Sequence, residues 1–217
     1  MADRNAETEK IINLWVEGGS DFAYYEKADS ADWVNGFWNE DSLFARNFSQ
    51  LNTEFTLEIA CGAGRHSERF IDNTKHIWLL DTSEAGLALA EKRLSPRSNF
   101  TTVHHPSGYG IPDIIQPESL TAVFSYDAMV HFEYDCVIAY VNDSYKALKP
   151  GGMALFHHSN YDKNPGGTID QNPSWRNFMS QSFFKHIAKR AGFNVIGSYV
   201  FPWVNTEITD CLTLLKK

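Results

Sequence analysis

The stretch Leu57-Glu58-Ile59-Ala60-Cys61-Gly62-Ala63-Gly64 decides the fold, because it is an apolar strand that runs directly into a glycine turn. Small residues at positions 60, 62 and 64 allow backbone N–H groups to approach a ligand closely. We expect a helix to follow the turn, and its first N–H groups would be further unpaired donors. Larger side chains here would fill the space that a ligand needs.

The next apolar run, His76-Ile77-Trp78-Leu79-Leu80, ends at Asp81. A carboxylate at the end of a neighbouring parallel strand can accept hydrogen bonds from both hydroxyls of a ribose. A strand, a glycine turn and an acidic residue in this order therefore predict a βα unit that holds a nucleoside.

Three later features extend the pattern. They are the predicted strand Ala122-Val123-Phe124-Ser125-Tyr126-Asp127, the turn Leu148-Lys149-Pro150-Gly151-Gly152 before the strand Met153-Ala154-Leu155-Phe156, and the helix end Ala191-Gly192-Phe193. From about residue 55 to residue 217, this order resembles the class I S-adenosylmethionine-dependent methyltransferases.

The resemblance implies S-adenosylmethionine as the cofactor. It places the cofactor at Glu58, Ala60, Cys61, Gly62, Gly64, Arg65, Asp81, Thr82, Ser107, Gly108 and Tyr126. Ala60 stands where the family usually has a glycine. The family often has an acidic residue for the adenine where this chain reads His104-His105-Pro106-Ser107-Gly108-Tyr109, so we expect Ser107 and backbone groups to hold the adenine.

From residue 55 onward, short apolar runs alternate with helical patterns, which is typical of a parallel sheet with helices on both faces. We expect strands near 55–60, 76–81, 100–105, 120–126, 152–158, 194–201 and 209–216, and helices near 83–94, 134–148 and 181–191. The predicted fold is α/β, a Rossmann-like, doubly wound, seven-stranded and mostly parallel sheet. Residues 51–217 would form this domain, and residues 1–50 an N-terminal cap of one or two helices.

The amino-acid composition limits the classes of function that the protein can have. The net charge is −8 without a compensating basic cluster, which argues against nucleic acid as a substrate. Three widely separated cysteines argue against a disulfide framework, and the sequence contains no run of membrane-spanning length. We expect a cytoplasmic protein that acts on a small molecule and does not bind a membrane; the oligomeric state stays open.

Candidate catalytic groups follow the fourth and fifth predicted strands, whose carboxyl ends should face one cleft. A hydroxyl acceptor needs a general base, and histidine has a suitable pKa. His131 is the first candidate, His158 the second and His157 the third. Candidate substrate contacts are Tyr24, Tyr25, Trp33, Trp38, Asp127, Asn160 and Arg176. We expect base catalysis without a metal, because metal-using members of the family present more carboxylates than this cleft.

The histidines after both strands also resemble those of a bacterial subgroup associated with sugar or polysaccharide modification, which agrees with a hydroxyl acceptor. Three alternatives remain: methylation of an amine, an NAD-dependent oxidoreductase, and a non-catalytic nucleoside-binding subunit. The oxidoreductase is disfavoured because Ser67 occupies the third glycine position of the dinucleotide-binding pattern.

Overall fold

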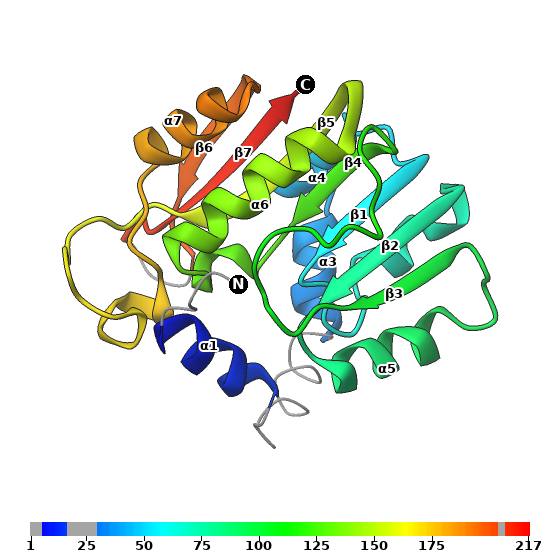
Figure 1. The fold of residues 1–217 in the computed structure, drawn as a ribbon, viewed down its shortest axis with the longest axis horizontal. Helices are drawn as coiled ribbons and strands as arrows, with labels where there is room; N and C mark the ends of the chain where they lie inside the picture. The colour runs from blue at the N-terminus through cyan, green and yellow to red at the C-terminus, as the bar shows by residue number, and fades with distance from the viewer. Residues whose placement is uncertain (1–5, 17–29, 204–206) are drawn as a thin grey trace.

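A seven-stranded sheet forms the centre of the molecule in a computed structural model, which describes residues 6–16, 30–203 and 207–217 (Figure 1). The strand order is β3-β2-β1-β4-β5-β7-β6, and β7 is antiparallel to both of its neighbours. The bounds are β1 Phe55–Ile59, β2 His76–Asp81, β3 Phe100–His104, β4 Leu120–Ser125, β5 Leu148–Ser159, β6 Asn194–Phe201 and β7 Asp210–Lys216. The predicted fold class is confirmed.

The three helices predicted after residue 80 begin and end within one residue of the expected positions. They are α5 Glu84–Leu94, α6 Tyr134–Ala147 and α7 Gln181–Ala191. The Ser83 hydroxyl accepts a hydrogen bond from the N–H of Gly86 and caps α5. Gly192 ends α7 with φ +113°, a left-handed conformation that a glycine adopts without strain.

Two hydrophobic clusters cover the two faces of the sheet. One cluster buries α6 and α7 against alternate strand residues such as Leu57, Val123 and Phe156. The other buries α4 (Leu43–Phe48) and α5 against the intervening residues, which include Phe124 and Leu155. Successive side chains along each strand point to opposite faces, so each strand supplies apolar side chains to both clusters, as expected for a sheet that is covered on both sides.

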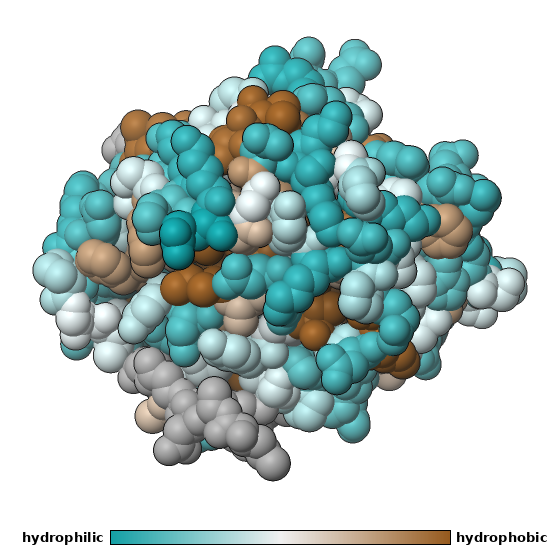
Figure 2. Space-filling view, turned by 45° about the horizontal axis from the view of Figure 1, so that its top comes forward, coloured by the Kyte–Doolittle hydropathy of each residue, from teal (hydrophilic) through white to brown (hydrophobic). Residues whose placement is uncertain are grey.

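The N-terminal segment contributes three described helices, α1 Ala6–Val16, α3 Ala31–Trp38 and α4. We expected one or two. Helix α1 is separate from the others and lies near the start of α6, where the Thr8 hydroxyl is 3.7 Å from Sγ of Cys136 (Figure 1). On the face drawn in Figure 2, hydrophilic residues predominate and hydrophobic residues form small, separate patches. No helix among the described residues is long and apolar enough to cross a bilayer.

The helix expected directly after the glycine turn was predicted wrongly. The described chain has two short 3-10 helices there, Ser67–Arg69 and Ile71–Asn73. The adjacent side chains of Phe70 and Ile71 are both buried, and the amide of Asn99 donates to the carbonyls of Ile71 and Thr74. These contacts replace the hydrogen bonds with which a regular helix would continue.

Strand β5 also begins earlier than expected, at Leu148 rather than near residue 152. Leu148 pairs with Leu120, and the pairing resumes at Met153 with Ala122. The residues between them form an irregularity in the register, so the predicted Pro-Gly-Gly turn is a bulge within the strand.

Candidate functional site

The glycine turn after β1 adopts the conformation that its small residues allow. Ala60, Gly62 and Gly64 have φ values of +56°, +52° and +72°. The carboxylate of Asp81 accepts hydrogen bonds from the N–H of Gly62 at 2.7 Å and of Ser83 at 2.9 Å. Burial raises the pKa of Asp81, and these backbone bonds oppose that effect. Asp81 therefore ties the turn to the start of α5.

Two of the predicted cofactor residues support the turn from outside the cavity lining. The carboxyl group of Glu58 is buried and accepts a hydrogen bond from the Ser67 hydroxyl. Burial raises the pKa of Glu58 to about 8. A Cβ at Gly64 would lie 3.1 Å from Cβ of Ala90, so this glycine lets the turn pack closely on α5.

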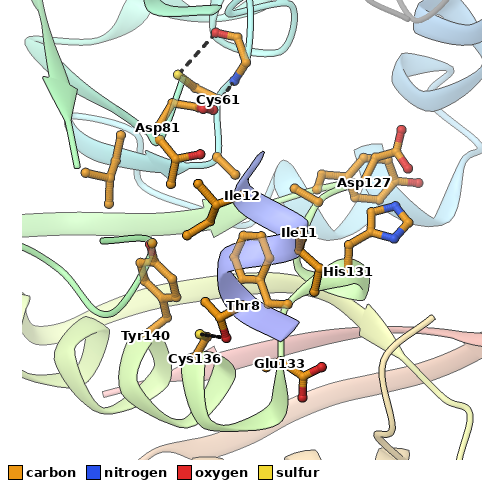
Figure 3. Close-up of a pocket in the computed structure, with 18 of the residues that line it drawn as sticks. Thr8, Ile11, Ile12, Cys61, Asp81, Asp127, His131, Glu133, Cys136 and Tyr140 are labelled. Atoms are coloured by element: carbon orange, nitrogen blue, oxygen red, sulfur yellow. Dashed lines mark hydrogen bonds between the residues drawn. The ribbon is translucent and has the colours of Figure 1, made fainter. Parts of the chain in front are cut away.

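A cavity lies at the carboxyl ends of β1, β2 and β4, with α1 across it (Figure 3). It brings together most of the predicted cofactor residues, together with His131 and Asp127. Its lining consists of Thr8, Ile11, Ile12, Ala60, Cys61, Gly62, Ala63, Arg65, His66, Leu80, Asp81, Thr82, Gly108, Tyr126, Asp127, Ala128, His131, Phe132, Glu133, Cys136 and Tyr140.

The loop after β3 closes one end of the cavity. A Cβ at Gly108 would lie 2.8 Å from Cδ1 of Ile12, so α1 packs directly on this backbone. Ser107 is outside the lining: its hydroxyl is 2.6 Å from Nε2 of His105 and accepts a hydrogen bond from the N–H of Tyr109. Ser107 therefore shapes the loop.

Sequence reasoning missed the contribution of α1 and of the first turns of α6. Thr8, Ile11 and Ile12 come from the segment that we expected to cap the core, but their place follows from contacts with distant parts of the chain. Cys136 and Tyr140 are four residues apart on α6, so they share a face. That spacing was the signal available in the sequence.

His131 lies at the cavity, and its ring has a defined orientation (Figure 3). Its Nδ1 is 2.8 Å from the carbonyl oxygen of Trp175, which can only accept a hydrogen bond. The neutral ring therefore carries its proton on Nδ1, and Nε2 is the unprotonated nitrogen. Burial lowers the pKa of His131 to about 4, so the imidazole is neutral at physiological pH.

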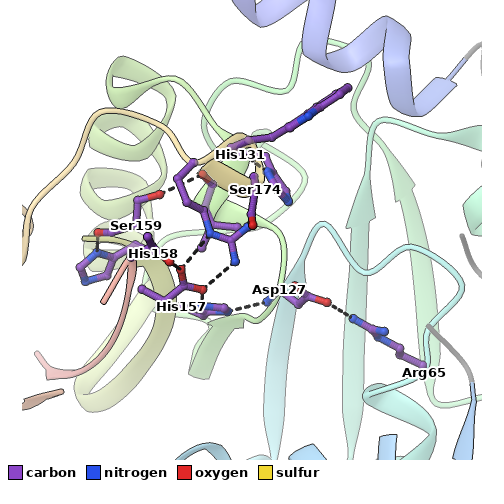
Figure 4. A network of polar contacts seen from close by, with 12 residues as sticks. Arg65, Asp127, His131, His157, His158, Ser159 and Ser174 are labelled. Carbon is purple, nitrogen blue, oxygen red and sulfur yellow. Dashed lines mark hydrogen bonds and ion pairs between the residues drawn. The ribbon is translucent and has the colours of Figure 1, made fainter. Parts of the chain in front are cut away.

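A buried chain of polar contacts runs from the cavity to the loop before α7 (Figure 4). Arg65 pairs with Asp127 at 2.8 Å, and the N–H of Asp127 donates to Nδ1 of His157 at 3.1 Å. Nε2 of His157 donates to Asp210 at 2.7 Å, and Arg176 donates to both oxygens of Asp210 at 2.8 and 2.7 Å. Thus Arg65 and Asp127 line the cavity, whereas His157 and Arg176 are buried behind it.

His158 is buried on the opposite face of β5. Its Nδ1 donates to the carbonyl of Ser159, its Nε2 accepts from the Thr213 hydroxyl, and the ring stacks on Phe184 at 3.7 Å between centroids. Burial lowers the pKa of His158 to about 3. Both ring nitrogens of His157 and of His158 are thus occupied within the protein.

The remaining predicted substrate contacts lie elsewhere. Tyr24 and Tyr25 are outside the described residues. Trp33 packs edge-on against Trp203 at 6.0 Å between centroids, and Trp38 packs among the aromatic residues of α4. Neither tryptophan belongs to the cavity lining.

Asn160 follows β5 and supports a helix rather than the cavity. Its Oδ1 accepts a hydrogen bond from the N–H of Gln181, the first residue of α7, at 2.9 Å. Among the described residues, no group of three or more His, Cys, Asp or Glu side chains is placed to hold a metal ion.

Two of the three comparisons with known proteins find similarity to methyltransferases. Residues 56–152 match the model of a methyltransferase domain, whereas a search of curated proteins finds no match. An S-adenosylmethionine-dependent methyltransferase from Mesorhizobium loti has a TM-score of 0.64 at 16% identity, covering 80% of this chain and 97% of that one. One from Clostridium acetobutylicum has a TM-score of 0.64 at 13% identity, covering 90% and 98%.

A third similar structure is a geranyl diphosphate C-methyltransferase from Streptomyces coelicolor A3(2), in complex with Mg²⁺, geranyl diphosphate and S-adenosylhomocysteine. It has a TM-score of 0.68 at 12% identity, covering 100% of this chain and 99% of that one. Likeness at these identities shows the fold. The matched residues 56–152 contain the glycine turn, Asp81 and His131. Residues 56–152 therefore match a methyltransferase domain, and the chain as a whole has the fold of these solved methyltransferases.

Proposed function

We propose that this protein is an S-adenosylmethionine-dependent methyltransferase that acts on a hydroxyl group of a small molecule, with His131 as the general base. The observation that carries the proposal is the hydrogen bond from Nδ1 of His131, a residue of the cavity lining, to the Trp175 carbonyl, which places the unprotonated ring nitrogen at Nε2. A base in this position can take the proton of a hydroxyl as the new C–O bond forms.

The residues around the turn fit the cofactor. The Asp81 carboxylate at the end of β2 is suited to the ribose hydroxyls, and the turn offers backbone N–H groups. When bound, the cofactor would supply an activated methyl group on its sulfonium sulfur, and S-adenosylhomocysteine would be the leaving group. The role of the protein is to position the reactants. Helix α1 covers the cavity, and the Arg65–Asp127 pair fixes two charges beside it.

A small acceptor agrees with the size and charge of the protein. The net charge of −8 disfavours a nucleic acid, and the helix across the cavity favours a compact molecule. We also propose that the protein works in the cytoplasm without a membrane partner. Asp127, which lines the cavity, is the substrate contact that we retain from the sequence.

The first test is a thermal-shift comparison of S-adenosylhomocysteine with NAD. A ligand at about 100 times its Kd stabilises the folded state by about 2.7 kcal/mol and raises Tm by roughly 5–10 °C in a chain of this size. S-adenosylhomocysteine alone should give the shift, whereas a shift with NAD alone would contradict the proposal. An acceptor screen with sugars, acids and amines follows.

With an acceptor identified, the decisive variant is His131→Gln. The loss of a general base predicts a kcat about 10²- to 10⁴-fold lower, with the affinity for S-adenosylhomocysteine unchanged. His186→Gln, on the exposed side of α7, is the matched control. A His131→Gln enzyme with normal kcat would refute the base. Amine acceptors whose methylation recovers at high pH in this variant would indicate an N-methyltransferase instead.

A further inference from the structure

Arg176 is connected by hydrogen bonds to a strained part of the backbone. In the part of the chain that the structure describes, five residues other than glycine have a positive φ. Three of them are Asp127 at +58°, Ser174 at +49° and Trp175 at +58°. A left-handed conformation is unfavourable for a residue that has a Cβ, and it persists where the surrounding structure enforces it, often at functional sites. Two branches of contacts that begin at Arg176 reach all three residues.

The first branch runs from Arg176 to the ring of His131 (Figure 4). Nη1 of Arg176 donates a hydrogen bond to the carbonyl of Ser174 at 2.8 Å, which holds the left-handed turn in place. The next carbonyl in this turn, that of Trp175, accepts from Nδ1 of His131 at 2.8 Å. On the other side of Arg176, the backbone N–H and the side-chain amide of Asn177 donate to the carbonyls of the residues before and after His131. The loop around Arg176 therefore holds both the ring and the backbone of the proposed base.

The second branch runs from Arg176 to the backbone of Asp127. Nε and Nη2 of Arg176 donate to the two carboxylate oxygens of Asp210 at 2.8 and 2.7 Å, which fixes the orientation of this carboxylate. Asp210 accepts from Nε2 of His157 at 2.7 Å, and Nδ1 of the same ring accepts from the N–H of Asp127 at 3.1 Å. A ring with its only proton on Nε2 satisfies both contacts. The branch therefore supports the left-handed backbone of Asp127.

The guanidinium group is suited to holding both branches at once. Its N–H groups form a planar, rigid fork, whereas the ammonium group of a lysine is a point charge. Arg176 is 2% exposed and is not part of the cavity lining, to which His131 and Asp127 both belong. Arg176 therefore acts on the cavity only through these two residues.

We infer that Arg176 is a positioning residue for methyl transfer, which sets the tautomer of His131 through one branch and the place of the Asp127 carboxylate through the other. This inference rests on the proposed function, in which His131 is the base and Asp127 a substrate contact. The guanidinium takes no part in the transfer itself. Because one buried side chain holds both groups, the base and the substrate contact keep a fixed position relative to each other.

The first test is imidazole ¹⁵N NMR, which reports the tautomer of His131 without any ligand. The wild type should show Nδ1–H at pH 7. Arg176→Lys keeps the charge but loses the fork, so it should show a mixture of both tautomers. The double variant Arg176→Met with Asp210→Asn removes the bond to Ser174 without leaving a buried unpaired charge, and it should give the same mixture. Leu120→Ala, a core variant at the opposite end of β4, should destabilise the protein but keep Nδ1–H.

The second test separates the two branches in kinetics with an acceptor from the screen. Arg176→Lys should lower kcat about 10- to 100-fold, because a small displacement of a catalytic group is costly. His157→Phe breaks only the branch to Asp127, so it should raise KM for the acceptor about 10-fold and leave the tautomer of His131 unchanged.

A single Nδ1–H tautomer of His131 in both Arg176 variants would overturn the inference, as would the same mixture in Leu120→Ala or an Nε2–H tautomer in the wild type. An unchanged kcat in Arg176→Lys would overturn it as well. A screen that finds no acceptor counts against the proposed function instead, and the NMR result then decides the inference alone.

Discussion

Replacement of Arg176 by methionine removes the cation from a buried ion pair while keeping much of the side-chain volume. Arg176 is 2% exposed and donates two hydrogen bonds to Asp210, which is 0% exposed, and a third to the carbonyl of Ser174 at 2.8 Å. The variant leaves the Asp210 carboxylate buried, with only His157 and Thr209 as partners among the described residues.

The cost follows from a buried carboxylate that has lost its guanidinium partner. Removal of one partner of a buried ion pair costs about 3–5 kcal/mol. For a chain of this length, each kcal/mol lowers Tm by about 2–4 °C, so we expect a decrease of roughly 6–20 °C at pH 7. Differential scanning calorimetry measures this decrease in Tm. The control variant is Arg97→Met, which removes an ion pair with Asp72 at the surface and should leave Tm unchanged.

The pH dependence of Tm for this variant distinguishes the loss of a charge from the loss of packing as the cause of the destabilisation. Burial alone would raise the pKa of Asp210, but hydrogen bonds from His157 and Arg176 hold it well below its usual value. Without Arg176 the carboxyl group should take up a proton more readily, so the destabilisation should be smaller at pH 4 than at pH 7. The double variant Arg176→Met with Asp210→Asn should recover part of the loss. A Tm within about 3 °C of wild type at pH 7 would refute the reasoning.

Three further predictions concern stability. Ala60→Gly should raise the free energy of unfolding by about 1 kcal/mol in urea titrations, because Ala60 has φ +56°; a lower value would show that the turn is not strained. Burial raises the pKa of Glu58 to about 8, so the protonated side chain stabilises the folded state fully below pH 4.5, and this stabilisation is lost as the pH rises to 8. The Glu58→Gln variant should therefore show a smaller decline of Tm between pH 6 and 8, and an unchanged slope would contradict this. The lowered pKa values of His66, His131 and His158 predict lower stability as the pH falls below 6.5. Urea titrations that show no loss of stability between pH 6.5 and 5 would reject this prediction.

Local signals in the sequence were sufficient for the sheet and the main helices. Ser83 and Gly192 mark helix ends through their own backbone chemistry, and the apolar runs before Asp81 and Tyr126 define strands whatever lies around them. The glycine turn could likewise be predicted, because its positive φ values need the small residues at those positions. These features depend on neighbours in the chain, which a sequence displays.

The candidate site depends more on contacts between distant residues. His157 and His158 point to opposite faces of β5 as alternation requires, but the sequence does not show that Asp210 and Thr213 of β7 would occupy both rings. The same is true of α1, whose Thr8 meets Cys136 across 128 positions of the chain. Contacts of this kind leave no periodic signal, so their positions needed the structure.

Strand β7 lies between β5 and β6, although it follows both of them in the chain. During synthesis, β5 and β6 therefore emerge with a gap between them, and their facing edges stay unpaired until β7 is available. Asp210, the first residue of β7, also brings the carboxylate that neutralises Arg176. Completion of this half of the sheet must therefore wait for β7, and nascent chains that lack β7 would expose two sheet edges to aggregation.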